Sequence, residues 1–327
     1  MIEINNEFLT GRTYIDLFCG IGGFHLALSS FGANCIFASD INKDAQTSYK
    51  KNFGIQPFGD ITKIAVQDIP PHDILCAGFP CQPFSISGNQ QGFDDEQGRG
   101  RLFFNIIDII HEHHPKMVLL ENVKNLEKHD GGNTLSRIRT ELQNEGYNVF
   151  HSILCAADYN VPQARQRIYI VAFRNDFGVQ EFHFPTELNE YATLDSILIQ
   201  DDDNEIQGKY YIDREYTIGN QNPERSKKLI RIGQIGLGRQ GERIYSINGL
   251  ASTLSSQGGG LGGKTGMYLI NGRIRKLYPR ECARLMGFPD SFILAQTQER
   301  CYNQFGNSVV VNVLQHIINQ TQNIWEG

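Results

Sequence analysis

The sequence has few features that would cross-link the chain, bind a metal or anchor it in a membrane. Its seven cysteines among 327 residues are an odd number at irregular spacings, without a CxxC pair or a Cys/His cluster. This pattern predicts neither a disulfide framework nor a metal site. No apolar run approaches the roughly 20 residues that cross a bilayer, and the N-terminus MIEINNEFLTG does not resemble a signal peptide. We therefore expect reduced thiols, no metal, no membrane partner and a cytoplasmic location.

The chain is acidic overall, but one stretch carries a net positive charge. The formal net charge of −6 argues, for the chain as a whole, against a polyanionic partner. Residues 225–285 nevertheless carry twelve Lys and Arg against two Glu, a local charge of +10 that leaves about −16 for the rest. Because this excess is interleaved with glycine, it favours a phosphate-binding face over a basic surface without a partner.

The first half of the chain alternates short apolar runs with amphipathic stretches. The runs predict buried strands at 13–19, 35–40, 72–78, 116–122 and 167–173, and the amphipathic stretches predict helices at 23–32, 43–54 and 101–115. This order predicts an α/β fold with a doubly wound, mostly parallel sheet.

The pattern changes after about residue 186, where short polar strands and the glycine-rich SSQGGGLGGKTG follow an acidic patch. We predict a first domain at 1–188, a second, smaller β-rich domain at 189–285, and a segment at 286–327 whose apolar helix returns to the first domain.

A glycine-rich loop follows the first predicted strand. In DLFCGIGGFHLAL, Gly20, Gly22 and Gly23 permit a tight turn and let a ligand approach the backbone. Asp40 ends the next candidate strand and Asp60 lies further along in GDI, and carboxylates at such positions can accept hydrogen bonds from a nucleoside. Either aspartate alone could be a helix cap or a turn residue. The loop and both aspartates together favour a cofactor of the adenosine type.

The stretch GFPCQPFSISG places Cys81 just past the strand at 72–78. A thiolate at the carboxyl edge of an α/β sheet can reach a substrate, so Cys81 is a candidate nucleophile. Cys76 lies inside the same strand and is predicted to be an inert core residue.

An acid partner is available in VLLENVKN, where Glu121 ends the next strand beside Asn122. Its apolar flanks favour a retained proton, although a salt-bridged glutamate is a common alternative. In QARQR, Arg165 and Arg167 share one face by period two and could hold an anion, a carbonyl oxygen or the glutamate itself.

The order and spacing of these motifs resemble the C5-cytosine DNA methyltransferases over nearly the whole chain. The resemblance rests on DLFCGIGG, GFPCQPFS, ENV, QARQR, RKLYPRECARLMGFP and FGNSVVVNV. Within that family, RQGERIYSINGLASTLSSQGGG is similar to the recognition domain of the short bacterial restriction-modification type that acts on GCGC. The resemblance makes domain 1–188 catalytic and cofactor-binding, 189–285 target-recognising, and 286–327 a hinge with a C-terminal helix.

The resemblance implies a DNA (cytosine-5-)-methyltransferase that converts S-adenosylmethionine to S-adenosylhomocysteine. The target cytosine is flipped out of the duplex and held by Cys81 through a covalent bond to C6, with Glu121 at N3. Residues 82–100 match the family's loop that closes over DNA. The implied catalytic residues are Cys81, Glu121, Arg165 and Arg167, with Arg165 holding the base oxygen and the glutamate.

The resemblance also assigns binding residues. Those for the cofactor are Phe18, Gly20, Gly23, Asp40, Ile41, Asp60, Ile61, Leu102, Asn307 and Val309. Those for DNA are Ser85, Ser87, Gln240, Arg243, Gln257 and Gly260, with Arg243 suited to read guanine. Ile41 and Gln257 depart from the pattern, because relatives have aromatic residues at both places. Adenine would therefore pack on an aliphatic side chain at Ile41.

Other activities fit part of this pattern. A tRNA cytosine-C5 methyltransferase or an inactive DNA-binding relative would share most of the motifs. A nicotinamide-dependent oxidoreductase would explain the glycine loop and Asp40 but neither ENV nor the basic second domain. We expect a prokaryotic, DNA-associated monomer whose cognate restriction endonuclease acts separately.

Overall fold

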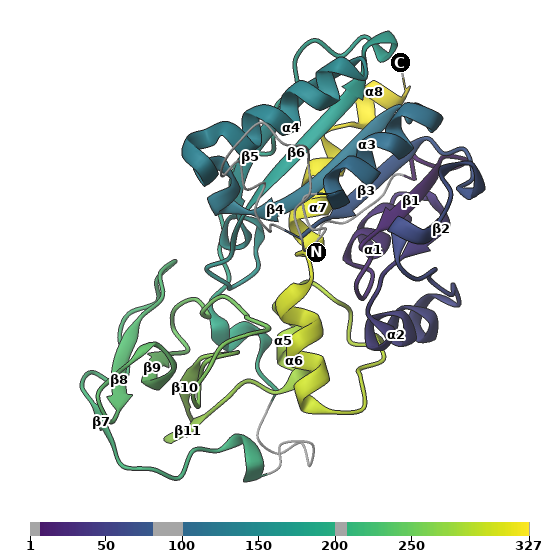
Figure 1. Ribbon diagram of the computed structural model, residues 1–327. Helices are drawn as coiled ribbons and strands as arrows, with labels where there is room; N and C mark the ends of the chain where they lie inside the picture. Colours follow the sequence, from purple (N-terminus) through teal and green to yellow (C-terminus); the bar gives the residue numbers. More distant parts are fainter. Residues whose placement is uncertain (1–6, 81–100, 200–207, 327) are drawn as a thin grey trace. The chain divides into compact units, whose positions relative to one another are not determined.

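The computed structural model describes residues 7–80, 101–199 and 208–326 (Figure 1). Its described residues form two compact units. The large-sheet unit combines 7–80, 101–154, 166–185 and 317–326, and the small-sheet unit combines 155–165 with 186–199 and 208–316. The boundaries at residues 188 and 285 are predicted for domains with different functions. The division into compact units does not test those functions, so the boundaries stay predictions.

The large-sheet unit is built on six strands in the order β2-β1-β3-β4-β6-β5. They are β1 (Thr13–Leu17), β2 (Asn34–Ser39), β3 (Ile74–Gly78), β4 (Met117–Val123), β5 (Tyr147–Cys155) and β6 (Gln166–Arg174). β1 pairs in parallel with β2 and β3, β3 pairs in parallel with β4, and β4 pairs antiparallel with β6. The predicted mostly parallel sheet is confirmed.

Helices cover both faces of this sheet. They are α1 (Gly23–Ser29), α2 (Lys43–Phe53), α3 (Arg101–His113) and α4 (Asn133–Asn144). Apolar side chains of α3 and α4 share one buried cluster with Ile15 and Leu17 of β1. On the opposite face, where the alternate residues of β1 point, His25 of α1 lies 3.0 Å from the Tyr14 hydroxyl, and the Tyr49 hydroxyl of α2 donates to Asp16. The sheet is therefore doubly wound.

The small-sheet unit carries five strands in the order β11-β10-β9-β8-β7. They are β7 (Tyr216–Ile218), β8 (Arg231–Ile235), β9 (Arg243–Ser246), β10 (Met267–Ile270) and β11 (Arg273–Arg275). Ile232, Ile244, Met267 and Ile274 form the buried core of this sheet. The predicted smaller β-rich domain is confirmed as a fold.

Helices α5 (Pro279–Arg284) and α6 (Gln298–Asn307) follow β11. The terminal helix predicted from sequence is divided into α7 (Val311–Asn319) and α8 (Gln322–Glu326) by a turn at residues 320–321. Within the described residues, no helix has both the length and the apolar character that a membrane crossing requires.

A buried ion pair joins β11 to α5. The guanidinium of Arg275 donates to both carboxylate oxygens of Glu281 at 2.8 Å, and both side chains are fully buried. Glu281 also accepts hydrogen bonds from the backbone N–H groups of Tyr278 and Ile199. Because Glu281→Gln removes the charge opposite a buried guanidinium, we expect the free energy of unfolding to fall by about 3 kcal/mol in urea denaturation.

An exposed ion pair on α5 provides the matched control. Arg284 and Asp290 approach to 2.8 Å, but their side chains are 31% and 61% exposed. Water screens such a pair, so Asp290→Asn should cost less than about 1 kcal/mol. Equal losses in the two variants would contradict a special contribution from the buried pair.

Candidate active site

The loop after β1 is tied to the end of β2 through one carboxylate. The backbone N–H of Gly20 donates to Asp40 Oδ2 at 2.8 Å, and that of Asn42 donates to Oδ1 at 2.7 Å. Burial raises the pKa of Asp40, and the N–H groups of Asn42 and Gly20 lower it. Each oxygen of a carboxylate has two acceptor sites. Asp40 can therefore hold this loop and still accept a hydrogen bond from a ligand hydroxyl.

The glycines of this loop have different structural roles. Gly20 and Gly22 both have positive φ, of 54° and 87°. A Cβ added at Gly20 would meet nothing closer than the Phe18 carbonyl oxygen at 4.0 Å, whereas one at Gly22 would collide with the Phe53 ring at 2.2 Å. Gly20 thus leaves open space beside the backbone, as a ligand-binding loop requires. Gly22 lets the loop pack against α2.

Apolar candidates for the cofactor site lie together. Ile61 belongs to the buried cluster beneath α3, and Phe18 and Leu102 are half-buried against the same cluster. Asp60 caps a short 3-10 helix, η1 (Ile61–Lys63), where its Oδ1 accepts a hydrogen bond from the backbone N–H of Thr62. With Gly20 and Asp40, these residues combine carboxylates, open backbone and apolar side chains, a set that fits an adenosine-type cofactor.

Three other cofactor candidates differ in exposure or in place. Ile41 is 72% exposed directly after Asp40. Asn307 is exposed at the end of α6, and Val309 is buried two residues later; both belong to the small-sheet unit. Gly23 begins α1 and is buried. The cofactor contacts of these residues stay predictions.

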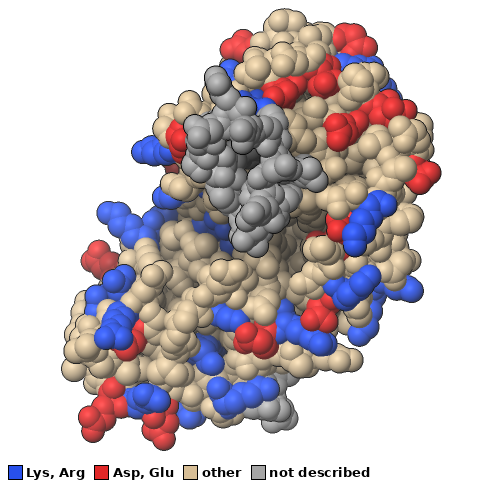
Figure 2. All heavy atoms as spheres, in the orientation of Figure 1, with Lys and Arg blue, Asp and Glu red and all other residues tan. Residues whose placement is uncertain are grey.

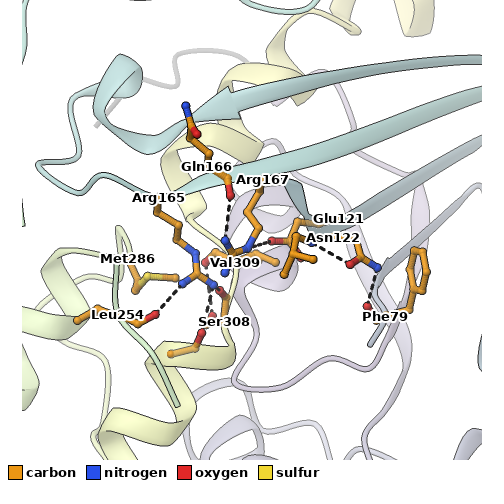
Figure 3. Close-up of polar contacts among 12 residues, drawn as sticks. Phe79, Glu121, Asn122, Arg165, Gln166, Arg167, Leu254, Met286, Ser308 and Val309 are labelled. Atoms are coloured by element: carbon orange, nitrogen blue, oxygen red, sulfur yellow. Dashed lines mark hydrogen bonds and ion pairs between the residues drawn. The ribbon is translucent and has the colours of Figure 1, made fainter. Parts of the chain in front are cut away.

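Glu121 lies in register with the end of β3. It pairs with Gly78 across the parallel β3–β4 ladder and is 8% exposed. The guanidinium Nε of Arg167 lies 3.0 Å from Glu121 Oε1, as Figure 3 shows. Glu121 therefore has an arginine as an ion-pair partner, which is the alternative that the sequence leaves open. Next to it, Asn122 donates to the Phe79 carbonyl at 3.0 Å.

The candidate nucleophile and its loop fall outside the described residues. That stretch contains Cys81, Ser85 and Ser87. The last described strand before it, β3, ends at Gly78, three positions before Cys81. Cys76, inside β3, is fully buried as predicted, and its thiol donates to the Ile15 carbonyl. Burial raises the pKa of the Cys76 thiol well above its ordinary value.

Arg165 lies within the small-sheet unit and holds two of its segments together. Its buried guanidinium donates to the carbonyl oxygens of Leu254, Gly306 and Ser308 at 3.2, 3.2 and 2.6 Å (Figure 3). These bonds connect the loop after residue 253 to the end of α6. Arg165 precedes β6 and Arg167 lies within it, and the two side chains have different partners.

Gln163 is a positioning residue that the sequence analysis does not identify. It is fully buried, donates to the Leu285 carbonyl at 2.8 Å and accepts from the Leu254 N–H at 3.1 Å. Its place at the start of QARQR is the only available signal in the sequence. A glutamine there supplies both a donor and an acceptor for two different loops.

The candidate DNA-reading residues gather at two adjoining loops. Gln240 is exposed in η9 (Gln240–Glu242), and Arg243 begins β9 directly after it. The N–H of Gly262 donates to the Gly241 carbonyl at 2.8 Å, which joins the glycine-rich loop to η9. Gly260 lies in that loop with a φ of 80°. Gln257, at its start, is exposed.

Folding neutralises part of the basic stretch. Arg225, Lys227, Lys264 and Arg284 form ion pairs with carboxylates from outside 225–285, namely those of Asp195, Asp158, Glu187, Glu299 and Asp290. Exposed arginines around η9 include Arg231 and Arg239. Figure 2 shows Lys and Arg side chains interspersed with a few carboxylates over the part that carries β7–β11. The positive surface is therefore smaller than the sequence count suggests.

Comparisons with known proteins agree with this architecture. A family model described as C-5 cytosine-specific DNA methylase matches residues 12–323. Type II methyltransferase M.HhaI from Haemophilus parahaemolyticus is 50% identical over 318 residues, which are 97% of this chain and 96% of that protein. M.HpaII from Haemophilus parainfluenzae is 40% identical, with 96% and 90% covered. The solved structure of S. pombe Dnmt2 methyltransferase, at 24% identity, has a TM-score of 0.71 over 96% of this chain and 98% of its own, and shows the fold.

Proposed function

The chain belongs to the C-5 cytosine-specific DNA methylase family, and from that premise we propose that it methylates C5 of a flipped-out cytosine in GCGC sites through a covalent Cys81–C6 adduct. It is a DNA (cytosine-5-)-methyltransferase of the kind found in restriction-modification systems, and its family depends on S-adenosylmethionine. The site, the adduct and the residue roles below are the proposal.

The cofactor pocket is assigned to residues at the ends of β1 and β2. Asp40 would accept hydrogen bonds from the ribose hydroxyls and Asp60 one from the adenine amino group. Phe18, Ile61 and Leu102 would supply apolar surface for the ring. When bound, S-adenosylmethionine provides a methyl group attached to a positively charged sulfur, which a carbon nucleophile can attack.

Cytosine C5 is a poor nucleophile, so the chain must activate it. The Cys81 thiolate would add to C6, and the electron density that enters the ring makes C5 able to form a bond with the methyl carbon. C5 would take the methyl group and leave S-adenosylhomocysteine as the product. Water would then accept the C5 proton, and the electrons of that C–H bond would restore the C5–C6 double bond and expel the Cys81 thiolate from 5-methylcytosine.

Glu121 would stabilise this addition by sharing a proton with N3, where the negative charge develops. The register of Glu121 with Gly78, three residues before Cys81, is the observation that carries the proposal, since a carboxyl group opposite the last residue of β3 supports a role for Glu121 near Cys81. Arg167 would orient the carboxylate. Arg165 would hold the Leu254 loop, and its predicted contact with the base oxygen belongs to the same proposal.

Recognition of GCGC is assigned to the adjoining loops of the small-sheet unit. Arg243 would read O6 and N7 of guanine in the major groove, because a guanidinium can donate two parallel hydrogen bonds to them. Gln240, with Ser85 and Ser87, would occupy the space that the flipped base leaves, and Gln257 and Gly260 would contact the DNA beside it. We also propose that the enzyme acts as a monomer, because one flipped base needs one active site, and that a cognate endonuclease acts separately.

Bisulfite sequencing tests the reaction and the site together. Plasmid DNA from a methylation-free bacterial host that expresses the chain should show protection of the first cytosine in GCGC, and DNA from a host expressing Cys81→Ala should show none. Protection in another short motif would overturn the GCGC assignment and keep the reaction. No protection with soluble wild-type protein would overturn the proposed DNA reaction and direct the assay to tRNA.

A further inference from the structure

An exposed aromatic side chain stands beside the candidate cofactor residues. Phe58 is 56% exposed, although its backbone is held by an isolated bridge to Ser39. Its N–H donates to the Ala38 carbonyl at 2.8 Å, and its carbonyl accepts from the Asp40 N–H at 3.1 Å. These bonds place Phe58 opposite Ser39 as a short parallel extension of the sheet beyond β2. Phe58 therefore has a fixed position next to Asp40 and two residues before Asp60.

One face of the Phe58 ring is covered. The ring stacks on Phe37 with centroids 4.8 Å apart and an interplanar angle of 14°. Phe37 is itself buried in the cluster that contains Ile61 and against which Phe18 and Leu102 pack. A ring held on one face and more than half exposed presents its other face to a ligand, with little rotational freedom left to lose on binding.

The neighbouring position lacks an aromatic group. Ile41, directly after Asp40, is 72% exposed and aliphatic. Ile41 follows Asp40 in the chain, and the Phe58 carbonyl accepts a hydrogen bond from the Asp40 N–H. The two exposed apolar side chains thus lie around the carboxylate that is assigned to the ribose.

We propose that Phe58 provides the aromatic face on which the adenine of S-adenosylmethionine packs, next to the aliphatic Ile41. The inference rests on the proposed cofactor site, because it requires Asp40 to hold the ribose of that cofactor. In the proposed site, Asp40 binds the ribose of the cofactor and Asp60 binds the amino group of its adenine. Phe58 is hydrogen-bonded to the backbone of Asp40 and precedes Asp60 by two residues, and an aromatic face is the surface that a nucleobase prefers for stacking.

Calorimetric titration with S-adenosylhomocysteine measures the contribution of the ring. Phe58→Leu keeps an apolar side chain but removes the aromatic face, and we expect Kd to rise about tenfold, which corresponds to about 1.4 kcal/mol. The matched control is Leu237→Ala, which changes an 80% exposed apolar side chain in the small-sheet unit and should leave Kd unchanged. The double variant Phe58→Leu with Ile41→Trp should recover most of the lost affinity, because it returns an aromatic group to the same corner.

A second readout reports the contact itself. The chain has a single tryptophan, and Trp325 is buried. In Phe58→Trp, addition of S-adenosylhomocysteine should quench the fluorescence of the new indole, and adenosine at high concentration should do the same.

The outcomes separate this inference from the proposed function. If Phe58→Leu binds S-adenosylhomocysteine as tightly as the wild type, the ring only packs on Phe37 and the inference is overturned, even where urea unfolding shows a loss of stability. If the wild-type chain itself binds no S-adenosylhomocysteine, the proposed function is overturned and this inference with it. A weakened Kd with unchanged unfolding in the absence of ligand supports the inference.

Discussion

Replacing Cys81 by alanine is expected to lower the rate of methyl transfer to duplex DNA by at least ~10⁴-fold. Without the sulfur, no bond to C6 can form, and C5 keeps the low nucleophilicity of an aromatic carbon. The variant should still bind a GCGC duplex and S-adenosylhomocysteine as tightly as the wild type, because neither contact depends on the thiol. Single-turnover transfer of a radiolabelled methyl group measures the rate, and gel shift and calorimetry measure the two affinities.

Cys76→Ala is the matched control, because Cys76 lies in β3, five residues before Cys81. The Cys76 thiol is fully buried, bonded to the Ile15 carbonyl, and burial raises its pKa well above the ordinary value. Such a thiol is inert as a nucleophile. The control variant should therefore retain transfer, with any loss confined to stability. Substantial turnover by Cys81→Ala would rule out the covalent mechanism.

The strands of the large sheet could be predicted where burial makes them continuous apolar runs. β1, β3 and β4 are buried along nearly their whole length, and the sequence shows this directly. β5 (Tyr147–Cys155) and α4 (Asn133–Asn144) are not predicted. β5 is half-buried over most of its residues and contains Asn148, His151 and Ser152, so its apolar period is weak. α4 begins after Gly132 without a side-chain cap, which removes the usual sequence signal of a helix start.

The residues of the site could be predicted from motifs, but several of their partners could not. Arg165 and Arg167 are equivalent in a period-two pattern. Only the antiparallel register of β4 and β6, which sets Val123 opposite Arg167, brings that arginine to Glu121. The charge of residues 225–285 likewise depends on carboxylates that the chain supplies from elsewhere, such as Asp158 for Lys227. Partners far apart in sequence are fixed by tertiary structure.

Glu121→Ala is expected to reduce kcat by about 10³-fold with little change in KM for DNA. The proton shared with N3 matters most when negative charge builds up in the ring, so its loss acts on the transition state more than on binding. Glu121→Gln keeps a hydrogen-bond donor of similar size but cannot transfer a proton. We expect this variant to lose about 10²-fold, an intermediate value that measures the hydrogen bond separately from proton transfer.

A carboxylate elsewhere in the large-sheet unit controls for loss of charge. Glu145 accepts a hydrogen bond from the His111 ring at 3.0 Å and is half-buried, as an ordinary structural glutamate is. Glu145→Gln should leave kcat unchanged. Steady-state kinetics on a GCGC duplex compares all three variants, and the Kd for S-adenosylhomocysteine should be the same in each, because Glu121 is assigned to the base and not to the cofactor. Full activity in Glu121→Ala would remove the acid from the mechanism. The ion pair with Arg167 would then serve only as a structural link between β4 and β6.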